Sequence, residues 1–194
     1  YNSGLSVPVI VYFPEKWKNY TNGKTIHGAF HGITESAIPN FNNTILAKGK
    51  TAKEQIQSAY SQGIENTTNI QFHFEIGGNY FLEIAKLKAF RILWKNKTGQ
   101  DAFVFASTTK NNKKEEFAYN NILRTTTECM SAIFGGANAI MINSYNHTFE
   151  NATEFSERIS RNQQTILRKE SYLDKVEDPT KGAYYTDYLI EKLL

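Results

Sequence analysis

The chain has 194 residues, of which 40% are hydrophobic and 13% aromatic, enough to bury one sizeable core. Its formal net charge is only +3, and acidic and basic residues alternate along it, which gives no electrostatic case for binding nucleic acid or an anionic membrane. The single cysteine, Cys129, excludes an internal disulfide framework and is typical of a reducing compartment. Because no apolar run approaches the length of a bilayer, we expect a cytoplasmic protein without membrane attachment.

Short β-branched and aromatic runs alternate with helical patterns along the chain, which is typical of βα units with parallel strands. The expected strands span residues 7–13, 25–30, 44–47, 70–76, 102–106 and 137–143. The last two are nearly continuous apolar runs, as expected for strands covered on both faces. Helices are expected over residues 51–62, 79–95, 117–134, 153–170 and 184–194.

Several helix ends carry their own signals. Asn79 follows a flexible glycine pair and is expected to cap the first turn of its helix. Gly135 and Gly136 are expected to provide a left-handed stop after residue 134. Thr153 is a further expected cap, with acidic residues in the first turn of its helix and basic residues in the last.

The element order predicts a single α/β domain over residues 1–194. About six parallel strands alternating with helices favour a partial or complete TIM (β/α)₈-type barrel, although such a barrel usually takes about 250 residues. An open α/β sheet is the alternative.

The four histidines give no clear site on their own. His27, His31 and Glu35 lie close in sequence, but they do not form a convincing ligand set, so no metal site is expected. His73 alternates with phenylalanines on a strand and is interpreted as a core or barrel-interior histidine. His147 follows a strand in an Asn-His-Thr loop and is expected to be exposed to solvent.

Two groups of charged residues are expected to lie at the surface. The run 110–114 carries lysines interrupted by asparagines and is followed by two glutamates, which indicates a solvated loop rather than a phosphate-binding patch. Glu83, Lys86 and Lys88 share one helix, and pairing on the helix surface is the expected explanation for them.

Three segments resemble a known family in the same order along the chain. They are residues 77–94 (GGNYFLEIAKLKAFRILW), residues 119–128 (YNNILRTTTE) running into Gly135-Gly136, and residues 153–163 (TEFSERISRNQ) leading to Asp178-Pro179 and to residues 182–185 (GAYY). All three resemble the methylmalonyl-CoA mutase family. The segment 44–63 more weakly resembles the strand and helix just upstream in that family.

The resemblance implies a barrel through whose centre an acyl-CoA thioester threads. A separate flavodoxin-like domain would present adenosylcobalamin over the barrel mouth, and its Asp-x-His-x-x-Gly signature does not occur in these 194 residues. The resemblance therefore implies no cofactor on this chain, with adenosylcobalamin carried by a partner subunit.

Five positions depart from the pattern that catalytic members of the family show. The place of their Tyr-His pair falls near Ile45 and Leu46, neither of which can donate a hydrogen bond to a carbonyl. Their His-Ser-Gln-Thr-Ser-Gly-type loop corresponds to a segment here that contains Ser107 and Thr109, without the histidine. Their polar Thr-Gln-Ser-Leu-His-Thr-Asn strand becomes residues 137–143, mostly apolar apart from Asn138 and its last residue. These five are interpreted as degenerate pocket positions, and no catalytic residue is assigned.

The leading hypothesis is the non-catalytic small subunit of a heterodimeric, adenosylcobalamin-dependent methylmalonyl-CoA mutase, stabilising the catalytic large subunit. One alternative is a divergent catalytic barrel fragment whose polar groups come from His27 or His31, with Phe30-His31 replacing the family's Tyr-His pair and His31 as the candidate catalytic residue. Another is a stand-alone CoA-binding module, which would retain a vestigial acyl-CoA site.

Overall fold

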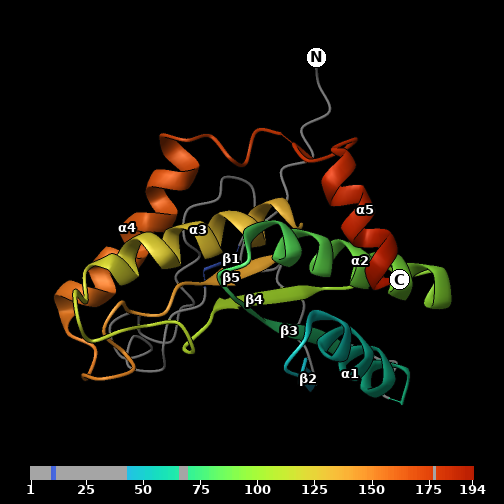
Figure 1. Cartoon of the computed structure of the whole chain (residues 1–194), viewed down its shortest axis with the longest axis horizontal. Coiled ribbons are helices and arrows are strands. Elements are labelled where there is room, and N and C mark those ends of the chain that lie inside the picture. Colours follow the sequence, from blue (N-terminus) through green and yellow to red (C-terminus); the bar gives the residue numbers. More distant parts are fainter. Residues whose placement is uncertain (1–9, 12–42, 66–69, 177) are drawn as a thin grey trace, which may run out of the picture.

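A computed structural model of the chain describes residues 10–11, 43–65, 70–176 and 178–194 (Figure 1). Its strands are β1 (Ile10–Val11), β2 (Asn43–Leu46), β3 (Ile70–Ile76), β4 (Val104–Thr108) and β5 (Ala139–Met141). Its helices are α1 (Ala52–Glu65), α2 (Tyr80–Thr98), α3 (Asn120–Phe134), α4 (Glu154–Lys169) and α5 (Tyr184–Leu193).

The described strands form one parallel sheet in the order β1-β5-β4-β3-β2. From β2 to β5, strands that follow one another in the chain are neighbours in the sheet, and a helix lies between each pair. Helices α2 and α3 run along the same side of the sheet (Figure 1). Consecutive parallel strands with covering helices make up a sector of a barrel, so the α/β prediction of a partial TIM-type barrel is confirmed.

Most predicted elements are confirmed to within a few residues. The strand at 70–76 has the predicted bounds, and all five helices are present. The strand predicted at 102–106 is wrong by two residues, because the ladder with β3 begins at Val104 and continues to Thr108. The strand predicted at 137–143 is shorter than expected, and the one at 25–30 lies outside the described residues. Of the strand at 7–13, only β1 is described.

The main core lies between the sheet and the helices. Alternate residues of β3 are buried, which directs Phe72 and Phe74 toward α2. There Phe72 meets the rings of Phe90 and Trp94 edge-on, with centroids 4.6 and 4.7 Å away. Burying each such side chain contributes about 2–3 kcal/mol. Gly63 of α1 lies directly against these rings, since an added Cβ would be 2.6 Å from Trp94.

Two of the three predicted helix-end signals behave as expected. Thr153 accepts a hydrogen bond from the amide of Ser156 and completes a capping box at the start of α4. Gly136 adopts a left-handed conformation, with φ of 79°, just after α3. The Asn79 prediction is wrong, because that side chain makes no capping hydrogen bond; only its carbonyl accepts, from the amide of Glu83.

Helix α5 packs on the outside of α2 (Figure 1). Between them, the ring of Tyr185 meets that of Phe81 edge-on, with centroids 5.6 Å apart. Lys88 of α2 binds Asp178 and Thr180 in the turn that leads to α5. The Asp-Pro turn therefore fastens the last helix to the barrel sector. Within the described part of the chain, no helix is both long and apolar enough to cross a membrane.

Candidate functional site

The carboxyl ends of β3, β4 and β5 meet at one edge of the sheet, called here the strand-end edge. Barrel enzymes carry their active sites at this edge, so catalytic or binding residues are expected here. Polar side chains from β3, from β4 and from the residues just after β5 gather at or near it. Glu75 lies opposite Ser107 in the β3–β4 ladder, and Asn143 follows β5 and binds Thr108 through its amide groups.

His73 points away from the helix-side core. This is the direction expected of a histidine that faces the interior of a barrel. Its Nε2 shares a hydrogen bond of 2.7 Å with the Oγ of Ser107. Its ring lies 4.6 Å from that of Phe105. Partial burial lowers the pKa of His73 below 6.5, and Glu75 opposes the shift. His73 and Ser107 thus satisfy each other on the sheet face opposite the helices.

The two positions aligned with the family's Tyr-His pair lie on opposite faces of β2. Ile45 is 5% exposed and belongs to the helix-side core, whereas Leu46 is 39% exposed and lies beside His73 in the ladder. Ile45 is therefore a packing residue. Leu46 alone of this pair is on the face that would line a barrel interior.

The three remaining pocket positions occupy two ends of the sheet. Ser107 and Thr109 are buried at the strand-end edge, where the amide of Thr109 donates to the carbonyl of Ile76. Asn138 precedes β5 at the opposite end. Its Oδ1 accepts from the amide of Val104 and from the guanidinium of Arg91, both at 2.9 Å, so its contacts hold the sheet to α2. His31 lies outside the described residues.

The segment 110–114 was expected to be a solvated loop, and for one lysine this is wrong. The side chain of Lys113 is 0% exposed and forms an ion pair with Glu128, whose side chain is 1% exposed. Asn112 donates a further hydrogen bond to the same carboxylate at 2.6 Å. Burial raises the pKa of Glu128 and lowers that of Lys113, while their mutual bonds act in the opposite direction.

A second buried charge lies under the loop that follows β3. Lys86 was expected on the helix surface, but its side chain is 1% exposed. It pairs with Glu83 and donates to Gln55 of α1 at 2.8 Å and to the carbonyl of Glu75 at 2.9 Å. Burial lowers the pKa of Lys86, and Glu83 opposes the shift. This lysine joins α1, α2 and the end of β3, a role that helix spacing alone could not indicate.

The expectation that His147 is solvent-exposed is also wrong. The side chain is half-buried, and its Nδ1 lies 2.7 Å from the carbonyl of Ser144, to which it donates. Partial burial lowers the pKa of His147. No cluster of metal-ligating side chains occurs among the described residues, and the His27, His31 and Glu35 group lies outside them.

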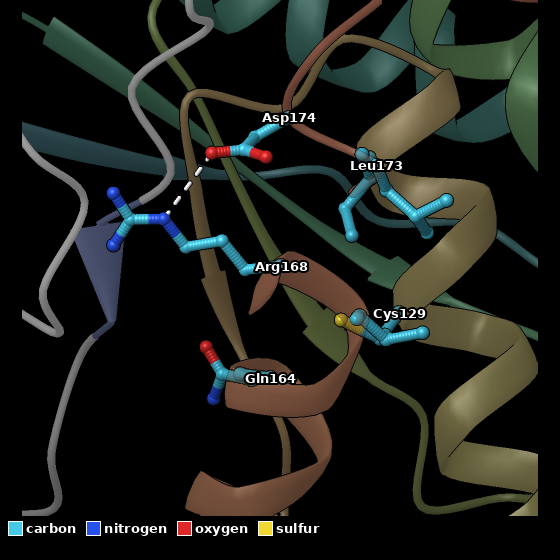
Figure 2. A pocket seen from close by; sticks show the side chains of 7 residues that line it. Cys129, Gln164, Arg168, Leu173 and Asp174 are labelled. Carbon is cyan, nitrogen blue, oxygen red and sulfur yellow. Dashed lines mark hydrogen bonds and ion pairs between the residues drawn. The ribbon is translucent and has the colours of Figure 1, made fainter. Parts of the chain in front are cut away.

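A small pocket lies away from the strand-end edge, between α3, α4 and the turn after α4. Figure 2 shows Cys129, Leu173 and the ion pair of Arg168 with Asp174 around it. Cys129 is 2% exposed, and burial raises the pKa of its thiol to about 12, as expected for a packing residue rather than a reactive thiol.

The chain is similar in sequence to a known protein family. The model of the protein family described as Methylmalonyl-CoA mutase matches residues 46–194. The chain is 38% identical over 159 residues to the methylmalonyl-CoA mutase small subunit of Porphyromonas gingivalis, covering 76% of this chain and 26% of that protein. It is 36% identical over 160 residues to the methylmalonyl-CoA mutase of Rhizobium meliloti, covering 76% and 22%. With the mitochondrial enzyme of Homo sapiens it shares 36% identity over 135 residues, covering 64% and 18%.

The chain thus spans about a quarter or less of the length of the curated relatives it matches. The matched region begins in β2 and includes every described helix. The chain therefore belongs to the methylmalonyl-CoA mutase family.

Proposed function

We propose that this chain is part of the barrel of a non-catalytic small subunit, which pairs with a catalytic large subunit in the interconversion of methylmalonyl-CoA and succinyl-CoA. Adenosylcobalamin would be bound by the large subunit. The role of this chain would be to stabilise that partner. The similarity to a protein named as a small subunit, at 38% identity, supports this assignment.

The non-catalytic part of the proposal rests on one observation: polar groups at the strand-end edge bind one another. Ser107 bonds His73, Thr108 bonds Asn143, and Glu128 is held by Lys113. A substrate-binding edge needs polar groups free to converge on a ligand. Here these groups are engaged with one another, which favours a structural role for this edge.

Most of the well-matched residues lie on helices and at helix ends. The turn at Asp178 that binds Lys88 belongs to this set, as does the capped start of α4 at Thr153. Retained helix packing together with altered residues at the family's pocket positions is the pattern expected when folding and assembly persist without chemistry.

Co-expression of the full-length protein with its large subunit tests the assembly directly. The proposal predicts a stoichiometric complex on size-exclusion chromatography and a higher melting temperature for the large subunit within it, because a partner that binds only the folded state stabilises it. A large subunit that stays separate, with an unchanged melting temperature in the presence of excess partner, would overturn the proposal.

A further inference from the structure

Residues 109–119 connect β4 to α3 and are called here the strap. The strap is fastened at two successive residues. Lys113 enters the interior to meet Glu128, and Lys114 exchanges two hydrogen bonds with Asn121, through its amide at 3.1 Å and its carbonyl at 2.8 Å. Asn121 also donates to the carbonyl of Tyr145 at 2.9 Å, in the loop after β5. Asn121 therefore links the strap to the loop after β5.

The ammonium group of Lys113 is fully coordinated. Its Nζ lies 2.8 Å from each carboxylate oxygen of Glu128 and 2.6 Å from the Oδ1 of Asn112. A primary ammonium has three N–H donors, and these three acceptors match them. Glu128 in turn receives the side-chain amide of Asn112. The arrangement is a complete binding site for a primary ammonium group.

The surroundings of this site are provided by the loop after β3 and by helices α2 and α3. Gly78, in the loop after β3, lies so close to Asn112 that an added Cβ would be 3.3 Å from its Nδ2. The charge of Arg124 in α3 lowers the pKa of Lys113, and that of Glu83 in α2 raises the pKa of Glu128. Glu83 itself forms an ion pair with Lys86. If Lys113 left, the Glu128 carboxylate would be buried without its counter-ion.

We propose that Glu128 and Asn112 form a binding site for a primary ammonium group, that the chain's own Lys113 occupies it as an internal ligand, and that this occupancy holds the strap closed over the strand-end edge. This inference goes beyond the proposed subunit role and does not depend on it. The same site would accept a primary alkylammonium ion if the lysine side chain were shortened. It would reject a neutral molecule of the same size, because only a cation compensates the buried carboxylate.

Chemical rescue in the full-length protein tests the proposal. The change Lys113→Ala removes four heavy atoms, which n-propylammonium replaces atom for atom. Hydrogen exchange at the amide of Lys114, which donates to Asn121, reports whether the strap is closed. We expect exchange there to accelerate on the order of 100- to 1,000-fold in the variant, the scale of a broken buried ion pair. Added n-propylammonium should restore most of the protection, whereas n-propanol should not.

Two further variants keep the outcome decisive. Lys114→Ala, which alters the neighbouring exposed lysine but leaves its backbone bonds, should exchange as the unmodified protein does. Lys113→Met keeps the volume but not the charge and should open the strap as well, which covers the case in which the alanine variant does not fold. Unchanged protection in Lys113→Met would overturn the proposal. So would rescue by n-propanol equal to rescue by n-propylammonium, or no rescue by either.

Discussion

Substituting Gly63 by alanine has two opposite effects on stability, one from helix propensity and one from core packing. Alanine is favoured over glycine inside a helix by about 1 kcal/mol, so propensity alone predicts stabilisation. The added Cβ would, however, lie 2.6 Å from the ring of Trp94 and 2.8 Å from that of Phe72. Both rings must therefore move by roughly 1 Å to restore ordinary contact distances.

The surrounding rings have little room to move. Phe72 and Trp94 are almost completely buried, and Phe90 packs against both. Overpacking of such a core costs about 1–3 kcal/mol, and the locked rings place this site in the upper part of that range. After the gain in propensity is subtracted, Gly63→Ala should lower the free energy of unfolding by about 1–2 kcal/mol.

Urea unfolding of the full-length protein, followed by circular dichroism, measures this difference. Ser61→Ala is the matched control, because Ser61 is exposed on the same helix and alanine there should change stability by less than about 0.5 kcal/mol. If Gly63→Ala proves as stable as the unmodified protein, or more so, then α1 does not pack on the aromatic cluster as described.

Three further changes have defined outcomes. Asn138→Ala should lower the free energy of unfolding by about 1–3 kcal/mol, because the buried amide of Val104 loses its acceptor. Thr153→Ala should cost about 1 kcal/mol through the lost cap of α4. The pKa of His73 is lowered in the folded state, so the unfolded chain binds the proton more readily and stability should fall as the pH drops below about 6.5. The variant His73→Gln should show a weaker dependence in this pH range, and His147, whose pKa is lowered in the same direction, contributes to the dependence that is left.

Each of these has a matched check. The Asn138 result should appear in urea unfolding and leave the far-ultraviolet circular dichroism unchanged, whereas a variant as stable as the parent would refute its role at the end of β5. For Thr153, the variant Thr153→Ser keeps the capping oxygen and should restore stability; equal losses for serine and alanine would contradict the capping explanation. A pH profile of unfolding that is identical with and without His73 would show that its protonation is not coupled to folding.

The sequence patterns predict the layers of this fold well, because burial follows periodicity. Alternation along residues 70–76 reflects one face against the helices, and the structure buries those alternate residues as the pattern indicates. The end of β4 was missed because Ser107 and Thr108 look like loop residues. They stay in the strand because His73 and Asn143 satisfy their hydroxyl groups, and such partners are distant in sequence.

The buried charges are where sequence reasoning failed, for a related reason. Lys113 and Lys86 are lysines, which are usually exposed. The i,i+3 pairing of Lys86 with Glu83 was expected, but its burial depends on Gln55, 31 positions away, and the burial of Lys113 depends on Glu128, 15 positions away. Long-range pairing of this kind leaves no periodic signal. The candidate pocket positions show the same limit. Alignment marked Ile45 and Asn138, but the face on which each side chain lies became visible only in the structure. The roles considered for His31 and for CoA binding stay predictions.

The conversion of methylmalonyl-CoA by the purified full-length protein, with adenosylcobalamin added and no second subunit, tests the central claim most directly. We predict no turnover above the uncatalysed background, and turnover when the catalytic large subunit is supplied. Conversion to succinyl-CoA by this protein alone would contradict the proposed non-catalytic role and would show that the strand-end edge supports chemistry despite its paired polar groups.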